Sequence, residues 1–178
     1  MSAQEYIGPI LYIIHAPLPE KILEYAKENT MPMQMTANKA KILTALNSAG
    51  IRGIPVVYAG STNKEWIKGT IAGIKHMPRI IWVRDFEADK ATLLQRRLAR
   101  EKVVPTKIAC MGTLRELCVS CATKAIKRAF PKADVHLIEG NYSMLRKTNR
   151  EMRQGIRKDL EAFGIKRVKK LSFKHLVK

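Results

Sequence analysis

The sequence predicts an α/β protein: a three-layer sandwich with a mixed central sheet and a helical N-terminal extension. From residue 54 onward, short apolar runs of strand composition alternate with segments whose apolar residues recur at helical spacing. With 178 residues and 46% apolar content, the chain can build one good core. We therefore expect an extension at 1–50 and a domain at 51–178, packed as one compact unit.

The first fifty residues contain one apolar run and two candidate helices. The run GPILYIIH at 8–15 predicts a buried strand that ends at His15. Helices are expected at 19–28, with Pro19 in the first turn, and at 38–48, where Gly50 ends the second helix. Three Met residues and Pro32 separate the two helices. We interpret these segments as an extension that packs on the core.

The rest of the chain alternates strands and helices. Strands are predicted at 54–59, 79–84, 106–111 and 133–138, and helices at 86–102, 113–129 and 142–163. Pro105 ends the first of these helices. Residues 64–74 predict a helix or a loop with helical turns. The last segment, 167–177, predicts an edge strand or a tail that orders on a partner.

The net charge of +18 arises from 33 Lys and Arg residues against 15 Asp and Glu residues. Such an excess indicates a polyanionic partner, most often nucleic acid, and a strongly acidic protein would also fit. The segment 145–178 alone holds twelve basic and three acidic residues. Within it, four arginines follow one another at spacings of three or four and predict a phosphate-binding stripe: Arg146, Arg150, Arg153 and Arg157.

Neither a membrane span nor a secretory signal is predicted, because no run of eighteen apolar residues occurs and no basic segment precedes the first apolar run. The three cysteines, an odd number, do not predict a disulfide framework. We expect a reducing compartment, the cytoplasm, at the site of action.

Cys118 and Cys121 form a C-x-x-C pair at the start of a predicted helix. Residues three apart lie on one face of a helix, where two thiolates can hold one zinc ion. A catalytic zinc requires a third protein ligand and a water molecule. The alternative is that both thiols pack in the core, which is also the interpretation we favour for Cys110 on the preceding strand.

The order of helix with an acidic N-terminus, strand, and helix opening with C-x-x-C and closing at Phe130-Pro131 resembles the zinc-dependent nucleobase (cytidine-type) deaminase superfamily, in particular its bacterial toxin-like branch. The match covers about residues 54–140. Glu87-Ala88-Asp89 stands where the family has H-A-E, and Leu117 stands where it has Pro.

The resemblance implies a zinc ion on Glu87, Cys118 and Cys121, with His15 or His76 as other candidates for the third ligand. Asp89 would then be the catalytic proton carrier, acting on a base of single-stranded DNA or RNA. Asn63 follows the first strand of the pattern and would contact the base, or it caps the next helix.

Two further functions stay open. The first is a non-enzymatic nucleic-acid-binding protein on a degenerate deaminase-like scaffold, and the second is a basic nuclease toxin. The toxin-like relatives suggest an effector delivered into a target cell and paired with an acidic immunity protein.

Overall fold

The structure is a computed structural model that describes residues 4–15, 32–60, 74–84, 87–112, 118–138, 150–169 and 171. Within these ranges lie the strands β1 (Tyr6–Ile14), β2 (Val56–Gly60), β3 (Ile80–Arg84), β4 (Val103–Gly112), β5 (Asp134–Ile138) and β6 (Lys166–Val168). The described helices are α2 (Pro32–Ile51), α4 (Ala91–Arg100), α5 (Ser120–Ala129) and α6 (Arg150–Ala162). None of these helices has the length and apolar content needed to cross a membrane.

The strands form one six-stranded sheet in the order β3-β2-β1-β4-β5-β6, and every neighbouring pair is parallel. The three-layer α/β architecture predicted from the sequence is confirmed. The expectation of a mixed sheet is wrong. Parallel neighbours require a crossover between consecutive strands, and α2, α4, α5 and α6 each lie in such a connection.

β1 lies in the middle of the sheet, between β2 and β4. The predicted strand at 8–15 is therefore confirmed, but our placement of residues 1–50 in an extension is wrong for this strand. Its residues are apolar at successive positions, and those from Ile10 to Ile14 are almost completely buried. A strand that is apolar on both faces needs a layer on each side, which only a central position provides.

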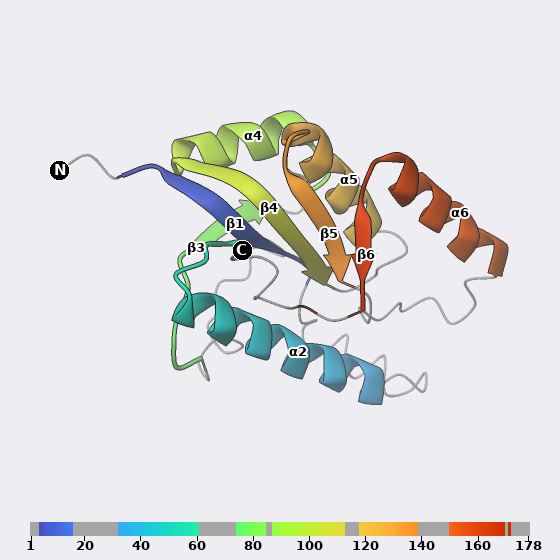
Figure 1. Ribbon diagram of the computed structural model, residues 1–178. Coiled ribbons are helices and arrows are strands. Elements are labelled where there is room, and N and C mark those ends of the chain that lie inside the picture. The colour runs from blue at the N-terminus through green and yellow to red at the C-terminus, as the bar shows by residue number, and fades with distance from the viewer. Residues whose placement is uncertain are drawn as a thin grey trace.

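Helices cover both faces of the sheet (Figure 1). α4, α5 and α6 pack on one face, where Tyr12, Val57 and Leu137 contribute to the larger core cluster. α2 covers the other face, where Leu11, Val56 and Met111 contribute to the second cluster. We call these the α4–α5 face and the α2 face. Successive residues of one strand enter opposite clusters, as the side-chain period of two requires.

Pro105 lies inside β4, a central strand that ordinarily excludes proline. A shift in register accommodates it: Gly8 pairs with Pro105, whereas Pro9 pairs with Lys107. Thr106 is thus the extra residue of a bulge, where the ladder of hydrogen bonds is already interrupted. The strand expected at 106–111 consequently begins earlier, at Val103.

The remaining elements agree in type with the expectations but differ in their bounds. α2 begins at Pro32, so Met33 and Met35 belong to a helix rather than to an interruption between helices. The helix expected at 86–102 spans Ala91–Arg100, because residues 87–90 form a turn. β6 confirms the edge-strand interpretation of the last segment for Lys166–Val168. The helices expected at 19–28 and 64–74 lie outside the described residues, apart from Ile74.

Candidate functional site at the carboxyl edge of the sheet

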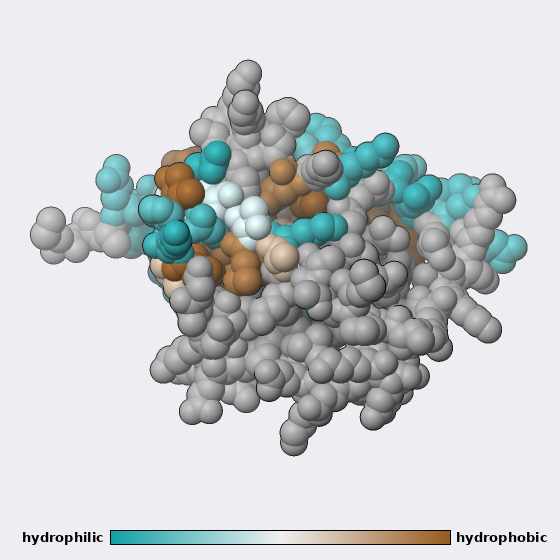
Figure 2. All heavy atoms as spheres, turned by 90° about the horizontal axis from the view of Figure 1, so that it is seen from below, coloured by the Kyte–Doolittle hydropathy of each residue, from teal (hydrophilic) through white to brown (hydrophobic). Residues whose placement is uncertain are grey.

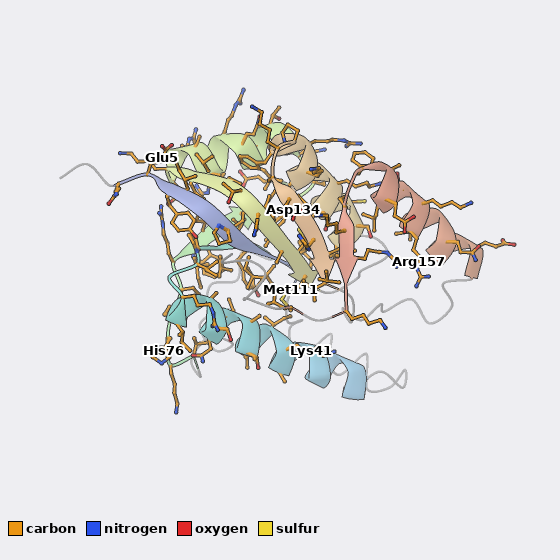
Figure 3. The ribbon with its side chains drawn as sticks, in the orientation of Figure 1. Glu5, Lys41, His76, Met111, Asp134 and Arg157 are labelled. Carbon is orange, nitrogen blue, oxygen red and sulfur yellow. The ribbon has the colours of Figure 1, made fainter. Side chains whose placement is uncertain are left out.

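The order in which the chain adds strands to the sheet reverses between β1 and β4. β2 and β3 follow β1 on one side, and β5 and β6 follow β4 on the other. In open parallel sheets, ligands bind beyond the carboxyl ends of the strands at such a reversal of strand order. Here these ends are Ile14 of β1 and Gly112 of β4, which are register partners. Met111, labelled in Figure 3, marks the same end of β4.

Gly112 allows the two strand ends to approach closely. A Cβ atom at this position would lie 1.9 Å from the carbonyl oxygen of Ile14, well inside van der Waals contact. His15, directly after β1, has a φ of 49° and donates its backbone N–H to the carbonyl of Ala59 at 2.8 Å. The ends of β1, β2 and β4 are therefore fixed relative to one another.

Tyr12 connects β1 to the turn before α4. Its hydroxyl donates a hydrogen bond to the Ala88 carbonyl oxygen at 3.0 Å, and both residues are buried in the core of the α4–α5 face. Burial raises the pKa of Tyr12 well above its ordinary value, and the nearby Cys110 and Asp89 raise it further. The hydroxyl thus stays a protonated donor, and the turn that carries Glu87 and Asp89 is fixed to the central strand.

The two carboxylates of this turn have different surroundings. Glu87 accepts a hydrogen bond from the backbone N–H of Arg84, at 2.9 Å from Oε2, and so closes the turn after β3. The Asp89 side chain is 53% exposed, and its Oδ1 lies 4.0 Å from Lys90 Nζ. Of the two, Asp89 is the more accessible to a ligand at this edge.

The C-x-x-C pair follows β4 and therefore lies at the same edge of the sheet. Cys118 is half-buried against the core of the α4–α5 face, in a π-helical turn that leads into α5. Cys121 is exposed on α5. Topology thus places Glu87, Asp89 and both cysteines at the carboxyl edge of the sheet.

Within the described ranges, no group of three or more His, Cys, Asp or Glu side chains is positioned to hold a metal ion. The described residues Glu87, Cys118 and Cys121 consequently do not form such a group. His76, an alternative third ligand, precedes β3 at the opposite, amino edge, where its backbone N–H donates to Asn47 Oδ1 at 3.1 Å. The zinc ion and the catalytic role of Asp89 stay predictions.

Cys110 is a core residue, as we expected because free cysteines are usually buried. It is completely buried on β4, and burial raises the pKa of its thiol to about 12, partly offset by a hydrogen bond with Thr123. Thr123 in turn donates to the carbonyl of Val119 at 2.6 Å. These bonds join the middle of β4 to the first turns of α5.

The predicted nucleic-acid-binding residues are described only in part. Asn63 and Arg146 lie outside the described residues, in the connections that leave β2 and β5. Arg150 and Arg153 belong to the backbone of α6, but their side chains are outside the description. Arg157 is exposed on α6 (Figure 3). α6 follows the carboxyl end of β5, so the predicted stripe begins near the same edge.

The ion pairs of the described residues engage several of the acids. Lys124 pairs with Asp159 at 2.5 Å, and Asp134 lies 2.8 Å from His136 and 3.0 Å from Lys166. Even if every one of the 15 acids paired with one basic residue, the net charge of +18 would remain on the surface. In the coloured part of Figure 2, apolar and polar side chains of the described residues lie beside one another. The excess of basic over acidic residues is what a polyanionic partner requires.

The outer strand β3 carries two exposed residues that the sequence analysis did not assign to the candidate site. Trp82 is 38% exposed, and Arg84, two residues later, is exposed on the same face. The alternation in RIIWVR could have revealed both, because Ile81 and Val83 are the buried residues of this strand.

Comparisons with known proteins bear on the fold alone. No known protein family matches the sequence, and no curated protein does. Among solved structures, the chain is similar to the MAR1 ribonuclease from Caenorhabditis elegans, with a TM-score of 0.55 and 14% sequence identity. The match covers 93% of this chain and 78% of the ribonuclease chain. It supports the α/β architecture described above.

Proposed function

We propose that the protein binds nucleic acid, with single-stranded RNA as its preferred partner, at the carboxyl edge of the sheet. The observation that carries this proposal is the net charge of +18, which the protein's own acids cannot neutralise. Phosphates attract such a surface through the release of their counterions, and this contribution is independent of sequence.

Two features favour the carboxyl edge as the place of binding. The reversal of strand order between β1 and β4 lies there, and α6, which carries the exposed Arg157, begins there. The similar fold of a ribonuclease, a protein that acts on RNA by name, favours RNA over DNA. The acidic immunity protein stays a prediction from charge alone.

The first experiment is a titration of fluorescein-labelled single-stranded RNA and DNA, followed by fluorescence anisotropy from about 50 to about 200 mM salt. We expect tighter binding of RNA and an affinity that falls steeply with salt. Arg157→Gln should weaken binding to every sequence and lower the salt slope by about one.

The matched control is Lys132→Gln, which removes an exposed charge from the turn before β5, at the amino edge. It should leave both affinity and slope close to those of the wild type. An absence of binding at low salt, or an affinity that does not change with salt, would contradict the proposal.

Cleavage of the bound RNA is a second candidate function, and Glu87 and Asp89 favour it. Carboxylate oxygens are ligands that magnesium prefers, and both residues follow β3 at the carboxyl edge. The deaminase hypothesis assigns Asp89 a different role at the same place. Mass spectrometry of RNA and single-stranded DNA after incubation with the protein distinguishes the two.

Shortened strands would indicate hydrolysis of the backbone, and full-length strands in which oxygen replaces a base amino group would indicate deamination. Asp89→Asn should abolish either reaction and leave binding intact. If neither the RNA nor the single-stranded DNA changes in mass, the protein binds nucleic acid without catalysing either reaction.

A further inference from the structure

The outer strand β3 presents an aromatic ring and positive charge on one side. In the described sheet β3 pairs with β2 alone, and no described strand covers its other edge. Ile81 and Val83 point into the core of the α4–α5 face, and Trp82 and Arg84 therefore belong to the α2 face. Trp82 keeps 38% of its surface exposed there.

Tyr58 holds the Trp82 ring in place. The two residues are register partners on β2 and β3, and their ring centroids lie 5.2 Å apart with an interplanar angle of 58°. Tyr58 is almost completely buried. Because this contact fixes the indole, its exposed part is a rigid apolar surface that loses little conformational entropy when a flat ligand stacks on it.

Guanidinium groups lie along the outer side of β3, the side that faces away from β2. Arg97 reaches over from α4 and donates Nε–H to the Trp82 carbonyl at 2.9 Å. Arg79, just before the strand, donates to the Glu101 carbonyl at 2.5 Å and to its carboxylate at 3.1 Å. A guanidinium has five N–H donors, so a bond from Nε to a carbonyl leaves Arg97 further donors for a phosphate.

Two acids among the described residues near this edge have partners. Glu101 forms the ion pair with Arg79, and Glu87 accepts the backbone N–H of Arg84. The neighbourhood of Trp82 thus combines an exposed indole with the guanidinium groups of Arg84 and Arg97, and stacking platforms for single-stranded nucleic acid have the same combination.

We propose that β3 is a binding site for single-stranded nucleic acid, in which a base stacks on Trp82 and the adjoining phosphates contact Arg84 and Arg97. The proposal rests on the proposed function and adds the surface and its chemistry. Stacking uses the π-face that every base has, so this site selects single strands over duplexes without reading sequence.

The experiment measures the affinity of wild type, Trp82→Ala and Trp82→Phe for labelled oligouridine by fluorescence anisotropy. Alanine should weaken binding about tenfold to one-hundredfold, whereas phenylalanine should restore most of the affinity. Urea unfolding of each variant checks that the fold is retained. Oligodeoxythymidine and a duplex of the same length serve as the comparison ligands.

A second measurement does not depend on replacing Trp82. The chain has two tryptophans, so Trp66→Phe leaves Trp82 as the only indole fluorophore. Titration of this variant with oligouridine should quench its emission to saturation at the concentrations seen by anisotropy.

The outcomes separate the two proposals. If wild type binds and Trp82→Ala binds equally well, with no quenching in Trp66→Phe, β3 is not the site and the proposed function stands. If wild type binds no nucleic acid at low salt, both proposals are overturned.

Discussion

The hydroxyl of Tyr12 on β1 bonds to the backbone carbonyl of Ala88 across 76 positions of sequence, at 3.0 Å. It joins the central strand to the turn that presents Glu87 and Asp89. The geometry of the carboxyl edge therefore depends on a bond from inside the core.

Tyr12→Phe should destabilise the protein by about 1–3 kcal/mol, because the Ala88 carbonyl would lose its buried donor while the ring stays packed. Tyr6→Phe is the matched control. The Tyr6 hydroxyl donates to the Pro9 carbonyl at 2.8 Å but is only partly buried, so water can replace it. Urea denaturation should rank the Tyr12 variant as clearly less stable, and equal losses would show that burial of the bond does not matter.

Much of the fold followed from local pattern. Continuous apolar runs predicted the strands at β1 and β2, and helical spacing predicted α4 and α5. The direction of the strands could not be predicted in this way. A strand in the middle of a covered sheet, such as β1, is apolar on both faces whether its neighbours are parallel or antiparallel. The parallel order depends on which faces the helices cover, and this is a property of the whole chain.

The candidate site was predicted only through the resemblance, which assigned Glu87, Cys118 and Cys121 to one zinc ion. The all-parallel order of the described sheet, which was not predicted, puts Glu87 and Cys118 after β3 and β4 at the carboxyl edge. The distance between Glu87 and Cys118 could not be predicted from the sequence, since it depends on how turns such as the one at Ala88 are fixed to the core. The exposure of Trp82 could have been predicted from the alternation in RIIWVR, although a tryptophan in a strand is buried by default.

Two helical glycines should respond in opposite directions to alanine. At Gly50 in α2, a Cβ would lie 1.8 Å from the His76 carbonyl oxygen. At Gly155 in α6, no described atom other than those of the neighbouring helix backbone lies within 4 Å of the corresponding Cβ position. Alanine at Gly155 should stabilise the protein by about 0.5–1 kcal/mol through helix propensity.

At Gly50 the same propensity gain should be outweighed by the backbone clash, and the variant should lose stability. Thermal unfolding of both variants tests this prediction. A stabilised Gly50→Ala variant would mean that α2 and the segment before β3 can separate without cost.

The three thiols should differ in reactivity. Burial raises the pKa of Cys110 to about 12, so in the folded protein it stays a thiol at pH 8 and is inaccessible. Cys121 is exposed and should be alkylated first by iodoacetamide. Peptide mass spectrometry should find Cys110 labelled only after unfolding in urea. In a time course of alkylation, Cys121→Ser should remove the fastest phase of the reaction. Rapid labelling of Cys110 in the native protein would contradict the burial described above.

Acid should weaken the contacts between β5 and β6. Burial alone would raise the pKa of Asp134, but its hydrogen bonds with His136 and Lys166 lower it overall. A lowered pKa in the folded state means that the ionised carboxylate contributes stability above about pH 4, and that this contribution is lost as the pH falls through the folded value. Asp134→Asn should therefore be less stable than wild type at neutral pH, by about 1 kcal/mol or less for a partly exposed group.

The two proteins should converge in stability at more acidic pH, because protonation removes the same charge. Chemical denaturation at a series of pH values checks this. A stability difference that persists unchanged below pH 3 would assign the effect to packing rather than to charge.

Zinc content tests the deaminase hypothesis directly. Elemental analysis should find about one zinc ion per chain in protein purified without chelator, because two thiolates at a helix N-terminus favour this metal. Cys118→Ser should lose it, whereas Cys110→Ser, which changes a buried thiol on β4, should retain it if it folds. Zinc bound by the wild type would mean that Cys118 and Cys121 gain further ligands from outside the described residues or by a rearrangement of the turn at Glu87. A chain without zinc would make the C-x-x-C pair part of the packing at the start of α5, and the basic surface with Trp82 would then be the main functional feature.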